Sequence, residues 1–218
     1  SESMAKRLVE ALKNDDLASL KELLGKGANP DTKNDYGEPA LHLVRSRRAA
    51  QLLLDARADV NAPDEIGQRA LHKLARYGPA TAVELLVASG ADPSAEDDYG
   101  KTPLHCAATS DEGEEKGPEA IYRILEAGAD PNVSDEDNRT PLHEAVRYMD
   151  PRGAQALLKA GADPNTRTRE EGYAPIHFTL SPAAVKFLSE SGADLDARDH
   201  NGMTALCELA AYSGREHL

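Results

Sequence analysis

A leucine or isoleucine followed by a histidine recurs five times along this chain of 218 residues. The five copies end at His42, His72, His105, His143 and His177, and a sixth copy, Leu206-Cys207, has lost the histidine. Successive copies lie 30 to 38 residues apart. A period of this length is typical of repeat proteins, in which each copy forms one structural unit that packs only on its neighbours.

A second marker keeps the same spacing and lies between the copies of the first. It reads Gly27-Ala28-Asn29, Arg57-Ala58-Asp59, Gly90-Ala91-Asp92, Gly128-Ala129-Asp130, Gly161-Ala162-Asp163 and Gly192-Ala193-Asp194. Because two independent markers repeat in phase, chance does not explain the period. The fold must therefore be built from similar consecutive units.

Each unit carries signals for helix starts and stops. Pro103 and Pro141 suit the first turn of a helix, where no backbone N–H is needed, and Thr102 and Thr140 precede them as N-caps. A second helix follows in each unit, as in 82–88 and 154–160, and stops at a glycine that tolerates the left-handed conformation. The polar stretches between units have room only for a turn or hairpin.

The copies Thr102-Pro103-Leu104-His105-Cys106-Ala107 and Thr140-Pro141-Leu142-His143-Glu144-Ala145 resemble the ankyrin repeat, and the resemblance covers essentially the whole chain. It implies an all-α repeat solenoid of stacked helix-turn-helix pairs with projecting β-hairpin-like turns. We divide the single domain into a capping repeat 1–33, repeats 34–63, 64–96, 97–134, 135–168 and 169–198, and a partial repeat 199–218.

Several repeats depart from the shared pattern. Arg57 occupies a glycine position, where positive φ costs a side chain about 1 kcal/mol, so the second repeat is expected to be a weak point. Asn138 replaces a turn glycine and is the best substitute there. The second and sixth repeats are about three residues short between their helices, whereas 110–117 forms an acidic insert that we expect to be a loop.

The two ends of the chain differ. Ala5, Leu8, Val9 and Leu12 form one apolar stripe, as a capping repeat requires. The last repeat stops at 214–218, where its second helix should begin, and either a longer native chain or an irregular cap accounts for this. Residues 1–3 are either native or left from cloning.

Composition limits the partners. The formal charge is −13, and phosphate backbones are bound through clustered Lys and Arg, so nucleic acid is excluded. No apolar run approaches the roughly 20 residues that span a bilayer, and no signal peptide begins the chain. We expect an intracellular protein, in the cytoplasm or the nucleus.

Cys106 and Cys207 are too few for a disulfide framework and are expected to be core thiols.

The repeated histidines do not predict a metal site. Packed helices lie about 8–10 Å apart, so histidines repeated once per layer cannot meet around one ion at the roughly 2 Å that ligation requires. The resemblance instead implies that each imidazole ties a helix start to neighbouring turns.

No nucleophile motif occurs, and we expect no catalysis and no cofactor. The acidic runs 97–98, 135–137 and 170–171 are interpreted as a solvated rim.

Hairpin tips and the ends of the first helices are the positions free to specialise, and in the family they form the concave face. Six of the seven tyrosines fall there, in a chain with nine aromatic residues. Tyr and Arg are frequent energetic centres of interfaces. The predicted protein-binding residues are Tyr36, Arg47, Ile66, Arg76, Tyr77, Tyr99, Lys101, Arg139, Arg147, Tyr148, Tyr173, Met203 and Tyr212.

These residues predict a non-catalytic, monomeric module, an adaptor or scaffold, that holds a partner protein or peptide on the concave face. Its arginines suit acidic or phosphorylated groups on that partner. The alternative is the recognition arm of a longer enzyme whose catalytic domain lies outside this chain. The resemblance also raises hydroxylation of Asn61, which stands within Asp59-Val60-Asn61.

Overall fold

The computed structural model describes residues 3–109, 113–147, 151–179 and 181–213. The chain forms two compact units, Ser1–Ala129 and Asp130–Leu218. Each unit is a stack of helical layers, and the two are described separately below. The described residues contain no strand, only isolated bridges between Lys33 and Pro39 and between Arg198 and Thr204, so the expected all-α class is confirmed.

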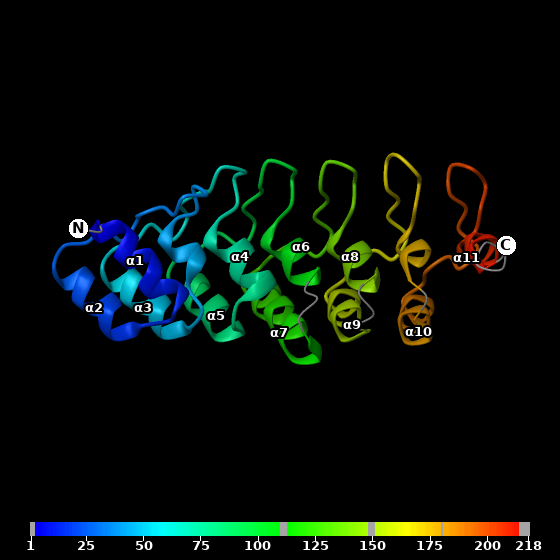
Figure 1. Ribbon diagram of the computed structural model, residues 1–218. Helices are drawn as coiled ribbons and strands as arrows, with labels where there is room; N and C mark the ends of the chain where they lie inside the picture. The colour runs from blue at the N-terminus through cyan, green and yellow to red at the C-terminus, as the bar shows by residue number, and fades with distance from the viewer. Residues whose placement is uncertain (1–2, 110–112, 148–150, 180, 214–218) are drawn as a thin grey trace. The chain divides into compact units, whose positions relative to one another are not determined.

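The first unit contains four layers, each with a first and a second helical element. The pairs are α1 (Met4–Lys13) with α2 (Leu17–Gly25), the 3-10 helix η1 (Ala40–Leu43) with α3 (Arg47–Asp55), α4 (Ala70–Tyr77) with α5 (Ala80–Ala88), and α6 (Pro103–Ala108) with α7 (Gly113–Glu126). In this unit the first elements lie between the hairpin loops and the row of second helices (Figure 1). Neighbouring layers contact through like elements, as α4 does with α6.

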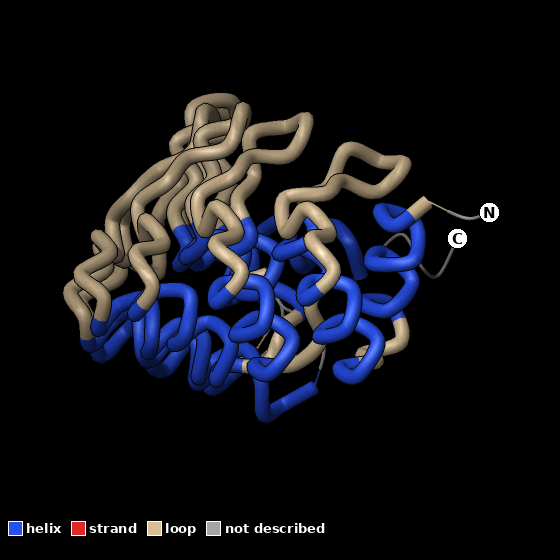
Figure 2. The backbone as a smooth tube through the Cα atoms, turned by 90° about the vertical axis from the view of Figure 1, so that its left-hand side faces the viewer, coloured by secondary structure: helices blue, strands red, loops and turns tan. Residues whose placement is uncertain are grey.

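The second unit repeats the arrangement. It pairs α8 (Pro141–Arg147) with α9 (Pro151–Lys159) and the 3-10 helix η2 (Pro175–Phe178) with α10 (Pro182–Glu190), followed by α11 (Ala205–Ser213). Within each unit the loops project from one side of the helices, as the tan segments of Figure 2 show. The hairpins therefore stand clear of the core, where their tips are accessible.

The helices begin and end where the sequence signals predicted. Helices α6 and α8 begin at Pro103 and Pro141, and the second helices end before glycines with φ near 90°, such as Gly90 and Gly161. Arg57 takes a φ of 68° and Asn138 a φ of 61°, so both occupy the left-handed region. Repeated leucines such as Leu71, Leu104 and Leu142 are fully buried inside the layers.

Four sequence expectations need correction. Ala5 is exposed, and Ala11 completes the buried face of α1 in its place, because the inward face is rotated by part of a turn. The expected loop 110–117 is helical from Gly113 onward, since α7 begins there and includes Pro118, whereas 110–112 lie outside the described residues. Cys106 is a core thiol, but Cys207 is exposed on α11.

The fourth correction concerns Arg47. It begins α3, with Ser46 as the N-cap, and so does not end a first helix. The reason is that both short repeats have only a four-residue 3-10 turn, η1 or η2, as their first element. Within the described part of the chain, no helix has both the length and the apolar character needed to cross a membrane.

Candidate functional site

Five of the described hairpins are each held by one carboxylate or amide side chain, and the hairpin of the sixth repeat is held instead by the hydroxyl of Thr168, which accepts the backbone N–H of Tyr173. Asp97 is buried, and its Oδ1 accepts hydrogen bonds from the backbone N–H groups of Tyr99 and Lys101, both at 2.9 Å. The residues that bond in the same way, to the second and fourth residues after them, are Asn34, Asp64, Asp135 and Asp199. The interpretation of Asp97 and Asp135 as solvated rim is therefore wrong. The sequence did carry a signal for this hairpin role, because Asp or Asn recurs three residues before the turn glycine.

In the first unit these hydrogen bonds fix the backbone of the hairpin tips, while the side chains at the tips stay in solvent. Tyr36 is 80% exposed, Tyr99 is 56% exposed, and Ile66 is also exposed. Successive tips are joined, because the backbone N–H of Asp98 donates to the carbonyl of Ile66 at 3.0 Å. An aromatic side chain on a backbone that is already ordered loses little additional entropy on binding.

The end of α4 adds a second pair of predicted residues. Tyr77 is 57% exposed, and the guanidinium of Arg76 lies 5.0 Å from the centre of its ring. The guanidinium of Arg47, by contrast, donates to the carbonyl of Thr81 at 2.8 Å, which places Arg47 with the second helices. Lys101 is half-buried, and its carbonyl accepts a hydrogen bond from His72 at 3.0 Å.

In the second unit, two of the predicted binding residues, Arg139 and Tyr173, already interact with other side chains of the protein. Arg139 pairs with Asp137 at 3.1 Å and lies 5.3 Å from the ring centre of Phe178. The Tyr173 hydroxyl donates to Glu208 at 3.0 Å, and this bond, followed by burial, raises the pKa of Tyr173. Arg147 is exposed and Met203 is half-buried. Tyr148 and the side chain of Tyr212 lie outside the described residues.

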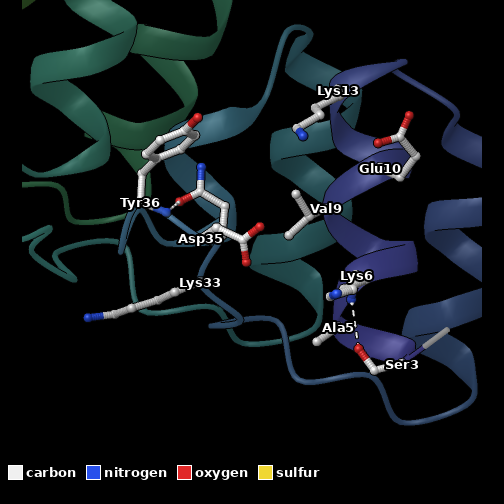
Figure 3. Close-up of a pocket in the computed structure, with 10 residues that line it drawn as sticks. Ser3, Ala5, Lys6, Val9, Glu10, Lys13, Lys33, Asp35 and Tyr36 are labelled. Carbon is white, nitrogen blue, oxygen red and sulfur yellow. Dashed lines mark hydrogen bonds between the residues drawn. The ribbon is translucent and has the colours of Figure 1, made fainter.

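A hollow of about 390 Å³ lies between α1 and the first hairpin (Figure 3). Val9 forms part of its floor, and Tyr36 stands at its edge. Its charged lining consists of three lysines, Lys6, Lys13 and Lys33, and two carboxylates, Glu10 and Asp35. Among the described residues, none of the three lysines forms an ion pair within 4 Å. Sequence reasoning missed this group because its members come from a helix and a hairpin 20 residues further along the chain.

An acidic cluster in the second unit is explained by its internal contacts. Ligand atoms of Asp137, Glu170 and Glu171 lie within 4.8 Å of one another. Asp137 already accepts hydrogen bonds from the backbone N–H groups of Arg169 and Glu170 and from the side chain of Arg139. Burial opposes ionisation of Asp137, but these donors outweigh it and lower its pKa. The carboxylate thus stabilises a turn.

His72 and His143 each connect a helix start to the next hairpin, as the resemblance implied, whereas His42 has no partner at Nδ1 and His177 has none at Nε2 among the described residues. Nδ1 of His143 accepts the backbone N–H of Thr140 at 3.0 Å, and its Nε2 bonds the carbonyl of Tyr173 at 3.1 Å. Burial is the main cause that lowers the pKa of His143 to about 4. Burial likewise raises the pKa of the Cys106 thiol to about 12, so this cysteine is not a reactive thiolate.

Known proteins match both the sequence and this architecture. The family described as Ankyrin repeats (3 copies) matches residues 8–97, 46–135 and 75–168. No curated protein matches the sequence. The crystal structure of the ankyrin repeat domain of Bcl-3, described as a unique member of the IκB protein family, is similar at 27% identity and a TM-score of 0.73, with 92% of each chain covered.

The crystal structure of the human ASB11 ankyrin repeat domain is similar in fold. Its TM-score is 0.81 at 24% identity, over 92% of this chain and 90% of that one. The family match extends from residue 8 to residue 168 and includes the repeated histidines up to His143. On this evidence the chain belongs to the ankyrin-repeat family.

Proposed function

We propose that this protein is a non-catalytic adaptor or scaffold that binds a partner protein through its hairpin tips and the ends of its first helices. Ankyrin repeats are protein-interaction modules. The observation that carries the proposal is the exposure of Tyr36, Tyr77 and Tyr99 on one unit of a chain that has only nine aromatic residues. We call the surface formed by Tyr36, Ile66, Arg76, Tyr77 and Tyr99 the tyrosine surface.

Exposed aromatic side chains on ordered backbone are costly to keep in water and valuable in an interface. Each fully buried aromatic side chain removes about 150–250 Å² from solvent, and apolar area contributes about 25 cal/mol per Å². Tyr77 carries Arg76 beside its ring, so the pair offers both apolar area and hydrogen-bond donors. The remaining predicted residues, Lys101, Arg139, Arg147, Tyr148, Tyr173, Met203 and Tyr212, stay predictions.

The tyrosine surface is tested by capturing partners from the source cell with the wild type and with a Tyr36→Ala/Tyr77→Ala/Tyr99→Ala variant. Tyr122 is an exposed tyrosine on α7, among the second helices, so Tyr122→Ala is the matched control. We expect the same proteins to bind the wild type and the control, and to be lost from the triple variant. Recovery of the same proteins by all three chains, with helix content unchanged, would place binding elsewhere.

The lysine-lined hollow supports a partner with acidic or phosphorylated groups. Lys6, Lys13 and Lys33 outnumber the two carboxylates of the lining, Glu10 and Asp35, so the hollow carries a net positive charge in a chain whose formal charge is −13. A Lys6→Gln/Lys13→Gln/Lys33→Gln variant should weaken partner binding and flatten its dependence on salt. Lys21→Gln/Lys159→Gln/Lys186→Gln makes the same change in net charge outside the hollow. Equal binding by both variants contradicts the acidic partner.

A further inference from the structure

A hollow of about 410 Å³ lies between α2 and α3, the first two helices in the row of second helices (Figure 1). Its lining is Leu17, Ala18 and Lys21 from α2 and Arg48, Gln51 and Leu52 from α3. This volume lies within the roughly 300–1,000 Å³ of small-ligand pockets, so it has room for a side chain of a partner. The row of second helices lies away from the hairpin tips, so this hollow is separate from the tyrosine surface.

Apolar side chains line the floor of this hollow and leave it open. Counted from the residue of positive φ that follows each helix, Leu17 of α2 corresponds to Arg47 of α3, and Leu52 of α3 corresponds to Leu85 of α5. Arg47 reaches across to α5, where it donates to the carbonyl of Thr81 at 2.8 Å, and Leu85 is buried. Leu17 has no polar group to make such a bridge, and Leu52 stays half-buried. The groove between α2 and α3 therefore keeps apolar surface in contact with water.

Two cations stand beside this apolar floor. Lys21 and Arg48 are exposed, and neither forms an ion pair within 4 Å among the described residues. Arg47 and Arg48 occupy the first two positions of α3, after the N-cap Ser46, where the helix dipole disfavours positive charge. An acidic group of a partner is therefore favoured here by the side chains and by the helix end together.

The carboxylates of α2 and α3 are engaged within their own helices. Asp16 caps the first turn of α2, Glu22 pairs with Lys26, and Asp55 accepts a hydrogen bond from the side chain of Gln51 at 2.8 Å. None of these three carboxylates belongs to the lining of the hollow. The lining thus presents two positive charges and no negative one.

The other second helices of the same unit have a different charge pattern. The one charged residue of α5 is Glu84. On α7, Arg123 pairs with Glu119 at 2.8 Å and with Glu126 at 3.3 Å. The cations without an ionic partner in the described part of this row therefore lie on α2 and α3, which makes this groove the place for an acidic segment.

We propose that the groove between α2 and α3 binds an acidic amphipathic helix of a second partner polypeptide, other than the one that the tyrosine surface holds. An apolar side chain of that helix packs between Leu17 and Leu52. Carboxylates one turn before and after it pair with Lys21 and Arg48. A helix suits the groove because residues three and four apart lie on one face, so apolar and acidic groups reach the hollow together.

The probe is the capped peptide Glu-Glu-Leu-Ala-Glu-Leu-Leu-Glu-Glu-Ala, titrated into the full chain while backbone amide NMR signals are recorded. One matched peptide has glutamine in place of every glutamate, and another has alanine in place of every leucine. We expect the acidic peptide to shift the signals of Ala18, Arg48 and Leu52, and both matched peptides to bind at least tenfold more weakly. Equal affinity of either matched peptide, or no shift at these residues, would overturn the site.

Reversing the two charges tests the same site from the side of the protein. Lys21→Glu/Arg48→Glu should reduce binding of the acidic peptide at least tenfold. Lys159→Glu/Lys186→Glu makes the same change in net charge on second helices of the other unit and should leave the binding unchanged. Circular dichroism checks that both variants keep their helix content. If the two variants bind the peptide equally, the site is refuted.

This site and the tyrosine surface can fail independently. The Tyr36→Ala/Tyr77→Ala/Tyr99→Ala variant should bind the acidic peptide like the wild type. The Lys21→Gln/Lys159→Gln/Lys186→Gln variant should bind the peptide more weakly while it keeps the partner of the tyrosine surface. Loss of peptide binding in the triple tyrosine variant, with helix content unchanged, contradicts a separate site in the groove.

Discussion

Pro39 leaves the buried side chain of His42 without a hydrogen-bond donor at Nδ1. Nε2 of His42 bonds the carbonyl of Ala62 at 2.9 Å, which leaves Nδ1 as an acceptor. In the other repeats the residue three positions earlier donates its N–H to this atom, as Thr102 does to His105 at 3.1 Å. Proline has no N–H, so the acceptor in the second repeat is unsatisfied.

Replacing Pro39 with threonine should therefore stabilise the chain. A net hydrogen bond contributes about 1 kcal/mol, partly offset by the greater freedom that a non-proline residue gives the unfolded state. We expect a gain of up to about 1 kcal/mol in the free energy of unfolding, measured with urea. The matched opposite is Ala174→Pro, which removes the donor to His177 at 3.1 Å and should cost about 1–2 kcal/mol. A loss from Pro39→Thr together with no effect of Ala174→Pro would contradict this account.

The buried histidines should make stability fall below neutral pH. The pKa of His143 is lowered to about 4, mainly by burial, against an ordinary value of 6.5. Between these values the unfolded state binds a proton that the folded state does not, so stability is complete above pH 6.5 and falls as the pH drops toward 4. The shift corresponds to roughly 3 kcal/mol for this one residue.

Titrating the imidazole signals by NMR and measuring urea unfolding between pH 4 and 8 check this prediction. The pKa values of His42 and His72 are also lowered, with burial as the largest cause, so their loss adds to that of His143. Below pH 4, protonation of carboxylates such as Asp137, whose pKa is lowered, adds a further loss. Histidine pKa values near 6.5, with stability flat from pH 7 to pH 5, are incompatible with the buried neutral rings.

Arg57→Gly should stabilise the second repeat. Arg57 has a φ of 68°, a conformation that costs a non-glycine residue about 1–2 kcal/mol. Gly90 is the matched site, because its φ is 93° and a Cβ there meets nothing within 4 Å. Gly90→Arg therefore imposes backbone strain without a clash. We expect shifts of about 1 kcal/mol in opposite directions, and shifts of the same sign would point to side-chain contacts instead.

Asn61→Asp should weaken the link between the second and third repeats. The Asn61 side chain donates to the carbonyl of Gly90 at 3.0 Å and accepts from the backbone N–H of Asp92 at 3.0 Å. A carboxylate keeps the second bond but replaces the donor with a charge facing a carbonyl. We expect a loss of about 1–3 kcal/mol, with faster amide exchange at Asp92.

Asn132 makes the same two bonds, to Gly161 and Asp163. Asn132→Asp should therefore cost a similar amount within the second unit. Asn29→Asp serves as the control, because it adds the same charge at an exposed residue whose side-chain oxygen accepts from the backbone N–H of Asp31, a bond that a carboxylate keeps. If Asn61→Asp is as stable as the wild type, the side chain does not couple the two repeats.

The sequence by itself determined the repeats, the helix starts at Pro103 and Pro141 and the left-handed positions of Arg57 and Asn138. These follow from local chemistry, because a missing N–H, a cap or a positive φ is a property of one residue and its neighbours. The repeated carboxylates such as Asp97 could also have been identified, since their bonds span only four residues. Their role was missed because a run of acidic residues was interpreted as solvated.

Only the tertiary structure decided which side chains from different repeats lie together and which of them remain exposed. Lys6, Lys13 and Lys33 share one hollow because the first hairpin folds back toward α1. Arg47 reaches Thr81 because η1 is too short to hold it in a first helix. Tyr173 is engaged by Glu208 and His177, whereas Tyr36 is left in solvent. Such differences depend on the shape of the adjacent layer, which a residue's own position within its repeat does not specify.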